Sequence, residues 1–308
     1  MNKKRIINEY VLLLLPFLVL QVTAQKTILP PYHADPSAKA FAGKYWIYPS
    51  HDLAGSKDWS MVDWHVFSST NLKKWKDEGV IFGLKDISWA KQFAWAPDAA
   101  YRNGKYYFYY PADFQIGVAV ADNPKGPFND PLGKPLIEKG EGNTLVIDPC
   151  IFIDEDSTAY LYFGQNKARS VKLKKDMITR DGPIMEVDVK NFHEGGWVHK
   201  RDSLYYFSYC AWEGDSVVAK AHPGAAREKV KYHGKIAYSV SKSPLGPWEY
   251  KGIIMDNGGR NNHHSIVKFG RRWYIFYHNM GPSFYERMVC VAPLNYDIDG
   301  AIKPVKLK

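Results

Sequence analysis

Three carboxylates stand at matching places in a pattern that repeats along this 308-residue chain. Asp35, Asp148 and Glu194 each lie ten to twelve positions before a run of aromatic residues, and such runs are typical of β-strands. Two carboxyl groups held across a small polar pocket can hydrolyse a glycosidic bond, because one protonates the leaving oxygen while the other activates water. A third carboxylate beside the acid raises the pKa of that acid by like-charge repulsion.

The same spacing recurs at two further places, where residues 95–98 and the pair His263 and His264 fill the polar position. The five aromatic runs start 45 to 68 residues apart and lie at residues 45–48, 106–109, 160–163, 205–208 and 273–276. Units of that length with four short antiparallel strands are β-propeller blades. The sequence therefore predicts an all-β, five-bladed propeller with four antiparallel strands per blade, whose polar positions converge on a catalytic funnel at the central axis.

The rest of the composition agrees with one large domain. Gly and Pro interrupt the chain every few residues, helical periodicity is almost absent, and no linker divides residues 25–308. Hydrophobic residues make up 45% of the chain, which is enough for a sizeable core. The formal net charge is +9, but the bases are scattered in pairs such as Lys73 and Lys74. We therefore expect a solvated surface and no nucleic-acid partner.

The first 24 residues have the layout of a secretory signal. A basic start at Lys3, Lys4 and Arg5 precedes an apolar run at 11–20 and small residues at 22–24. The apolar run is too short for a comfortable membrane span. We expect a mature chain that begins near Gln25, is exported to the periplasm or secreted, and has no membrane span after signal removal.

The three cysteines, Cys150, Cys210 and Cys290, lie far apart in apolar runs that resemble strands. One disulfide plus a free thiol is possible, but three buried strand residues are the simpler interpretation. The chain has no CxxC pair, which argues against a thiolate zinc site.

Five short segments together resemble the blade-start motifs of family 43 glycoside hydrolases. They are 33–37 (His-Ala-Asp-Pro-Ser), 95–98 (Trp-Ala-Pro-Asp), 147–149 (Ile-Asp-Pro), 193–197 (His-Glu-Gly-Gly-Trp) and 262–265 (Asn-His-His-Ser). The similarity covers nearly all of the mature chain, in order and with matching blade spacing. That family is a five-bladed propeller whose members invert anomeric configuration, so the resemblance implies the same fold and stereochemistry here.

Carried over position by position, the resemblance assigns the three carboxylates. It implies that Asp35 is the general base, that Glu194 is the general acid, and that Asp148 tunes the pKa of the acid and orients it. The two reacting carboxyl groups should then lie about 6.5–9.5 Å apart, leaving room for a water molecule.

The remaining assignments also follow from the resemblance. His263, or as a second choice His264, is similar to the histidine that helps to hold a metal ion, usually calcium, in the channel below the sugar. We thus expect one Ca2+ and no organic cofactor. Trp95 is similar to the aromatic wall of the terminal-sugar subsite, and Arg287 to an arginine that contacts sugar hydroxyls.

The acid segment departs from the family in one respect. The family motif often reads Glu-Gly-Pro, whereas this chain has Glu194, Gly195 and Gly196. We expect a looser loop there with an unchanged role for the acid.

Each motif also has a simpler interpretation. Asp35 and Asp148 each precede a proline and could be turn formers. His263 and His264 could be hydrogen-bonded core residues, Arg287 a surface strand residue, and Trp95 ordinary packing between blades. A zinc motif HExxH at His193 fails, because Trp197 occupies its last position.

We expect a monomeric, exo-acting glycosidase that removes terminal pentose from plant oligo- or polysaccharides. We favour α-L-arabinofuranosidase, because the chain lacks the C-terminal β-sandwich that many β-xylosidases of the family carry. β-Xylosidase and endo-arabinanase are the near alternatives, and the stretches 52–63 and 211–235 are the expected specificity loops. A non-catalytic sugar-binding propeller is the alternative from another class. A retaining fructan-cleaving propeller is disfavoured, because its first blade would carry Asn-Asp-Pro-Asn where residues 34–37 read Ala-Asp-Pro-Ser.

Overall fold

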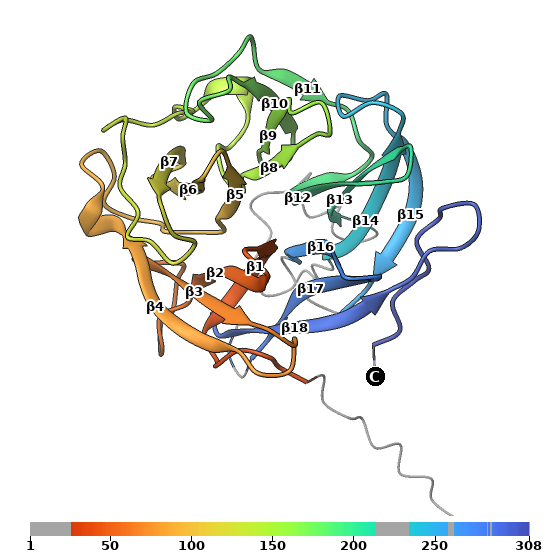
Figure 1. Ribbon diagram of the computed structural model, residues 1–308, viewed down its shortest axis with the longest axis horizontal. Helices are drawn as coiled ribbons and strands as arrows, with labels where there is room; N and C mark the ends of the chain where they lie inside the picture. Colours follow the sequence, from red (N-terminus) through yellow and green to blue (C-terminus); the bar gives the residue numbers. More distant parts are fainter. Residues whose placement is uncertain (1–25, 213–233, 258–261, 282, 284, 308) are drawn as a thin grey trace, which may run out of the picture.

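Five small antiparallel sheets surround one axis in the computed structural model (Figure 1). The structure describes residues 26–212, 234–257, 262–281, 283 and 285–307. The predicted signal at 1–24 and most of the predicted specificity loop at 211–235 lie outside these residues. The five sheets around one axis make the chain the five-bladed β-propeller that the sequence predicts.

The blades follow one another along the chain, and within each blade the strands pair in sequence order. Blade 1 has β1 (His33–Phe41), β2 (Lys44–His51), β3 (Asp63–Ser69) and β4 (Lys76–Gly83), and blade 2 has β5 (Asp98–Arg102), β6 (Lys105–Ala112) and β7 (Gln115–Ala121). Blade 3 has β8 (Cys150–Ile153), β9 (Ala159–Phe163), β10 (Ala168–Leu173) and β11 (Met185–Val187), and blade 4 has β12 (Phe192–Arg201), β13 (Leu204–Trp212), β14 (Gly234–Ser241) and β15 (Glu249–Met255). Blade 5 has β16 (His264–Phe269), β17 (Arg272–Met280) and β18 (Arg287–Leu294). Two short 3-10 helices, η1 (Leu84–Asp86) and η2 (Glu141–Asn143), interrupt the connections.

The fourth strand is reduced in two of the blades. In blade 2 it is replaced by two isolated bridges to β7, Ile116 with Ile137 and Val120 with Asn129. In blade 5 the N-terminal segment takes this place: Thr27 forms a bridge with Cys290, and the Ile28 amide donates to the Val289 carbonyl at 2.9 Å. The start of the described chain thus pairs with its last blade, which closes the ring.

The first strands of the blades form the innermost ring. Each of β1, β5, β8, β12 and β16 contacts its neighbours around the axis (Figure 1). Equivalent positions at the start of each inner strand must therefore face one another, which is what the repeat spacing predicted. Aromatic side chains of the second strands, such as Phe108 and Tyr206, are buried between the sheets, where large rings contribute much of the apolar burial.

Asp98 joins three blades at this inner ring. Its carboxylate accepts hydrogen bonds from the Ser37 hydroxyl and from the Ile151 amide, the latter at 2.7 Å. Lys39 forms an ion pair with it at 2.8 Å. A fully buried charge is tolerated only with such partners, so Asp98 has a structural role.

All three cysteines are free and buried, as the simpler interpretation held. Among the residues that the structure describes, no helix has the length and apolar character needed to cross a membrane.

Candidate active site

A pocket lies at the end of the axis where the inner strands begin, and all the favoured site residues line it. Its cavity volume is about 120 Å³. The walls are formed by Asp35, Asp148, Glu194, His263, Trp95 and Arg287, together with Trp59, Met61, Ala96, Ile147 and Gln165. The structure therefore brings together residues that lie more than 250 positions apart in the sequence, as the repeat required.

Asp35 is held in a fixed geometry on blade 1. Its backbone has a φ of 49°, a left-handed conformation that Asp tolerates better than most residues, and a register shift between Ala34 and Ser37 marks a bulge there. The Ser50 hydroxyl donates to Asp35 Oδ2 at 2.5 Å, and Arg287 Nη1 donates to Oδ1 at 2.7 Å. The carboxylate is thus oriented by hydrogen bonds from Ser50 on β2 of its own blade and from Arg287 on β18 of blade 5.

Arg287 is in turn fixed by Asp52. The guanidinium donates to both oxygens of that carboxylate, from Nε at 3.0 Å and from Nη2 at 2.7 Å. Arg287 is 1% exposed, so the simpler interpretation of a surface strand residue is wrong. Most of its donors are used on Asp35, Asp52 and Ser50. The predicted contact with sugar hydroxyls stays a prediction, whereas the positioning of Asp35 is directly visible.

These neighbours control the charge of Asp35. Burial would raise the pKa of Asp35, but the positive charges of Arg287 and His263 hold it well below its usual range. The group is therefore ionised at neutral pH. An ionised carboxylate can accept a proton from water, which is the state that a general base needs.

The opposite wall carries two carboxylates from blades 3 and 4. Gln165 Nε2 donates to Glu194 Oε2 at 2.6 Å, and the Gly195 amide donates to Asp148 Oδ2 at 3.1 Å. Asp148, like Asp35, has a positive φ, here 56°. Both aspartates of the funnel therefore use a backbone conformation that turns the carboxylate away from the regular strand direction.

Asp148 and Glu194 titrate as a pair. Burial, together with the charges of Glu194 and Asp35, raises the pKa of Asp148 to about 7. Burial acts in the same direction on Glu194, but His193 and His263 lower the pKa of Glu194 to about 2. Near neutral pH the pair keeps one proton because two adjacent buried carboxylates cannot both ionise cheaply.

His263 lies between the two walls. Its Nδ1 is 3.3 Å from Asp35 Oδ1, and its Nε2 is 3.4 Å from Glu194 Oε1 and 3.5 Å from Asp148 Oδ2. Burial would lower the pKa of His263, but Asp148, Asp35 and Glu194 together raise it to about 10. The imidazole ring of His263 thus spans the gap between the oxygens of Asp35 and Glu194. The separation of these oxygens is therefore below about 9.5 Å, the upper limit for the two carboxyl groups of inverting enzymes.

His264 points elsewhere. Its Nε2 lies 2.7 Å from the Ser208 hydroxyl, and burial lowers the pKa of His264 to about 3. It lines a cavity of about 20 Å³ that also touches Asp35, Asp148 and His263. His264 does not line the main pocket, but it borders the small cavity beside His263, so its role as the second-choice metal ligand stays a prediction.

The donors beside His263 fit the predicted calcium ion. Atoms of Asp148, Glu194 and His263 lie within 4.8 Å of one another, all three are buried, and the small cavity next to them can hold about one ion or water. His263 and the Asp148 carboxylate would hold the ion, which would supply positive charge below the sugar. Without an ion, protonated His263 supplies that charge itself. Calcium stays a prediction.

The acid segment is packed more tightly than the sequence suggested. Gly195 has a φ of 62°, and a Cβ there would lie 3.0 Å from the His263 ring. A Cβ on Gly196 would lie 2.7 Å from Phe207. The expectation of a looser loop is wrong: the two glycines form a bulge in β12 whose register shifts on both sides of Glu194, and they allow His263 to approach.

The aromatic wall has two members. Trp95 Nε1 donates to the Trp59 carbonyl at 2.7 Å, and the Trp95 carbonyl accepts from Trp64 Nε1 at 2.7 Å. The Arg287 guanidinium lies 4.5 Å from the centre of the Trp59 ring. Trp59 and Met61 come from the stretch 52–63, one of the two predicted specificity loops.

The sequence pattern did not indicate Gln165, Ser50, Asp52, His278 (whose Nδ1 accepts a hydrogen bond from the Asp35 amide at 3.2 Å) or Trp59. The first four lie at or after the ends of second strands, and the spacing of the aromatic runs carries no signal for side chains there. Their positions follow from strand register: Ser50, for example, pairs with Ala34 next to Asp35.

The comparisons with known proteins agree with this geometry. The sequence profile described as "Glycosyl hydrolases family 43" matches residues 24–302. The chain belongs to glycoside hydrolase family 43. It is 33% identical over 338 residues to the "Xylosidase/arabinosidase 43A" of Humicola insolens, an alignment that covers 88% of this chain and 96% of that protein.

Two solved family 43 structures superpose closely on this chain. The GH43_1 enzyme from Xanthomonas citri complexed with xylose has a TM-score of 0.79 at 32% identity, covering 92% of this chain and 93% of its own. The α-L-arabinofuranosidase CtGH43 from Clostridium thermocellum has a TM-score of 0.74 at 37% identity, covering 89% and 94%. The chain is thus a glycoside hydrolase whose relatives act as xylosidases and arabinosidases.

Proposed function

We propose that this family 43 member is an inverting exo-glycosidase that removes terminal pentose, preferentially α-L-arabinofuranosyl residues. The observation that carries the proposal is the single pocket in which ionised Asp35 faces the proton-sharing pair Asp148 and Glu194. One wall is set up to accept a proton and the other to supply one, as glycoside hydrolysis by inversion requires.

The proposed reaction uses these residues in order. Asp35 removes a proton from a water molecule, which attacks the anomeric carbon from the side of Arg287 and Ser50. The proton held by the acid pair must lie on Glu194 as the glycosidic oxygen approaches, and Glu194 then donates it to that oxygen. Asp148, whose pKa is raised by burial and by the charges of Glu194 and Asp35, allows the pair to keep a proton near neutral pH.

The size of the pocket supports exo action. A cavity of about 120 Å³ is small beside the roughly 300–1,000 Å³ of pockets for larger ligands, and Trp59 and Trp95 border it. One sugar ring fits such a space better than a stretch of polymer. Endo-arabinanase activity is therefore the weaker alternative.

The preference for arabinose is supported by the relatives. The structural neighbour named an α-L-arabinofuranosidase shares 37% of its sequence with this chain, and the Humicola insolens relative, named for both sugars, shares 33%. We also propose that the chain is exported, that it acts as a monomer, and that its partner is an oligo- or polysaccharide. The basic, apolar and small residues of 1–24 support export.

The first test compares two substrates. Release of p-nitrophenol from the α-L-arabinofuranoside and the β-D-xyloside is measured with the mature protein, beside Asp35→Ala and Glu194→Ala. Faster hydrolysis of the arabinoside supports the proposal, and faster hydrolysis of the xyloside overturns the substrate while keeping the reaction. Binding of arabino-oligosaccharides without turnover of any substrate would indicate a sugar-binding propeller instead.

A further inference from the structure

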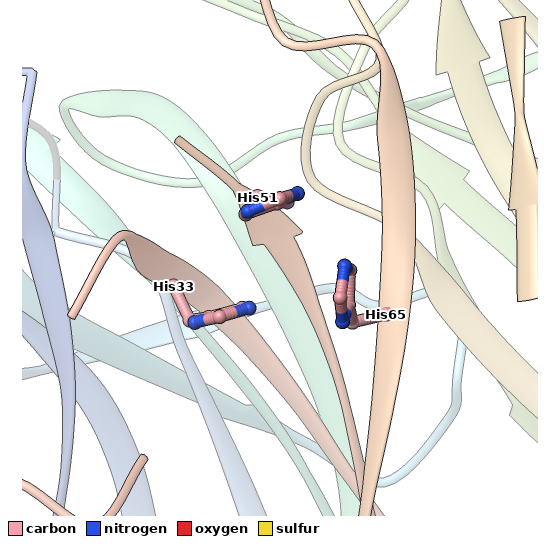
Figure 2. Close-up of side chains that lie close together, drawn as sticks. All are labelled: His33, His51 and His65. Atoms are coloured by element: carbon pink, nitrogen blue, oxygen red, sulfur yellow. The ribbon is translucent and has the colours of Figure 1, made fainter. Parts of the chain in front are cut away.

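Three histidines of blade 1 meet beside the active site but outside its pocket. His33 begins β1, His51 ends β2, and His65 lies on β3. His33 and His51 are direct partners across the β1–β2 ladder, so their side chains share one face of the sheet. Figure 2 shows the three rings gathered around one space. Their centroids are 5.0 Å (His33–His51), 5.4 Å (His33–His65) and 4.5 Å (His51–His65) apart.

Each ring is oriented by an acceptor on its Nδ1 atom. His33 Nδ1 donates to the carbonyls of Pro30 and Pro31 at 3.2 and 3.1 Å. His51 Nδ1 donates to Asp63 Oδ1 at 2.6 Å, and His65 Nδ1 lies 3.2 Å from both oxygens of Asp77. Carbonyl and carboxylate oxygens only accept, so the proton of each neutral ring is on Nδ1.

Within the part of the chain that the structure describes, no protein donor reaches the three Nε2 lone pairs. The hydrogen bonds found among the described residues do not involve Nε2 of His51 or His65, and the buried His33 Nε2 atom has no partner there. A buried nitrogen without a partner costs free energy unless something else occupies it. The side chains of His51 and His65 are 26% and 17% exposed, so an ion can enter from solvent.

We propose that His33, His51 and His65 bind one divalent transition metal ion of the zinc type through their Nε2 atoms, with solvent as the fourth ligand. Three neutral imidazoles whose Nδ1 atoms are held by carboxylates or carbonyls are the donor set that Zn2+ uses. One ligand atom from each ring lies within 4.8 Å of the others. The His33 and His51 rings are nearly parallel, with 8° between their planes, so both must turn about their side-chain torsions to bring the nitrogens to about 3.3 Å, the spacing that tetrahedral zinc requires.

The site would stabilise the part of blade 1 that positions the general base. His33 is two residues before Asp35, and His51 lies between Ser50, which donates to Asp35, and Asp52, which holds Arg287. An ion shared by β1, β2 and β3 would tie these three strand ends together. The site is separate from the predicted calcium position, which involves His263 on the axis.

Metal binding to the mature protein tests the proposal directly. After dialysis against EDTA, the protein is titrated with Zn2+ by calorimetry, and Co2+ is added to a second sample to record its visible absorption. His65→Gln removes a proposed ligand, Asp77→Asn removes an acceptor that orients His65, and His263→Gln removes the axial histidine. Thermal unfolding in EDTA establishes that each variant is folded.

The expected result is one equivalent of Zn2+ bound by the wild type and by His263→Gln, and none by His65→Gln. Asp77→Asn should bind about 10- to 100-fold more weakly, and it carries the test if His65→Gln does not fold. Tetracoordinate cobalt absorption should follow the same order. Absence of zinc binding by the wild type would overturn the proposal. So would binding that survives in His65→Gln or is lost in His263→Gln.

Discussion

The two walls of the pocket handle charge in opposite ways. On the Asp35 wall, one carboxylate faces a buried guanidinium, and Asp52 fixes that guanidinium through two of its nitrogens. On the Glu194 wall, two carboxylates lie together, and protonated His263 between the walls lies within 3.5 Å of both. A carboxylate with its own cation stays ionised, whereas two carboxylates around one cation retain a proton.

The difference shows how one buried pocket can accept and donate protons at the same pH. Burial alone raises the pKa of every carboxyl group, so it cannot separate a base from an acid. The separation comes from where the fixed positive charge is placed. Arg287 on β18 faces Asp35 at 2.7 Å, and the described residues place no arginine or lysine within ion-pair distance of Asp148 or Glu194.

The largest effects should come from removing either reacting carboxyl group. Asp35→Asn should lower kcat by about 10²–10⁴-fold on every substrate, because each reaction needs the activated water. Glu194→Gln should lower kcat as much on arabino-oligosaccharides, because their sugar leaving group needs a proton. On an aryl glycoside with an acidic phenol, the same variant should lower kcat much less. Steady-state rates on both substrate types measure this. Equal sensitivity of the two variants to the leaving group would remove the distinction between the walls.

The second largest effect concerns the proton that Asp148 and Glu194 share. The neutral amide introduced by Asp148→Asn can neither hold a proton for the pair nor raise the pKa of Glu194 by its charge. Without Asp148 the proton step of the pair near pH 7 disappears. Glu194 alone, whose pKa is lowered by His193 and His263 against the effect of burial, loses its proton at lower pH. The descending limb of the kcat/KM–pH profile should move down by about one unit or more. An unchanged descending limb would show that Asp148 does not tune the acid.

On the other wall, Arg287→Lys should change the ascending limb. The pKa of Asp35 is held low by the Arg287 charge, and lysine cannot reproduce the bonds to Asp35 and Asp52 together. The pKa of Asp35 should rise, so the ascending limb should move to higher pH. Arg169→Lys is the matched control, because Arg169 is also buried but bonds to Gly142. A shift of the limb in both variants would argue against a specific effect.

The smallest effect tests the backbone of the acid wall. Gly195→Ala introduces a Cβ at a φ of 62° and 3.0 Å from the His263 ring, whereas Gly43→Ala meets a similar φ of 72° with no atom within 4 Å. Both variants should lose about 1–2 kcal/mol of stability from the backbone conformation. Gly195→Ala alone should also lose activity, because it displaces His263. Chemical denaturation and kcat measure the two effects, and equal activity in both variants would contradict the proposed contact.

The sequence predicted the fold and the main walls of the pocket because both follow from one repeat. Asp35, Asp148 and Glu194 could be placed together, since equivalent positions of propeller blades meet at the axis. The assignment of acid and base came from family resemblance alone, and its chemical basis lies in contacts such as Arg287 with Asp35.

Other features could not be predicted because they depend on register. Gln165 lines the pocket, while Ser50 and Asp52 hold the wall residues Asp35 and Arg287. All three lie at or after the ends of second strands, and neither their residue type nor their spacing marks them. His33 and His51 are 18 positions apart in sequence, yet they are direct partners in the sheet. The tight packing of Gly195 was also not apparent, because the ring that it touches comes from another blade.

The central claim is that Asp35 and Glu194 act from opposite sides of the sugar with a water molecule between them. Proton NMR of the first turnover products from an α-L-arabinofuranoside tests this most directly, because the anomer formed first reports the side of attack. β-L-Arabinofuranose should appear first and then mutarotate. Initial formation of the α anomer would show retention and would contradict the assignment of Asp35 as a base acting through water.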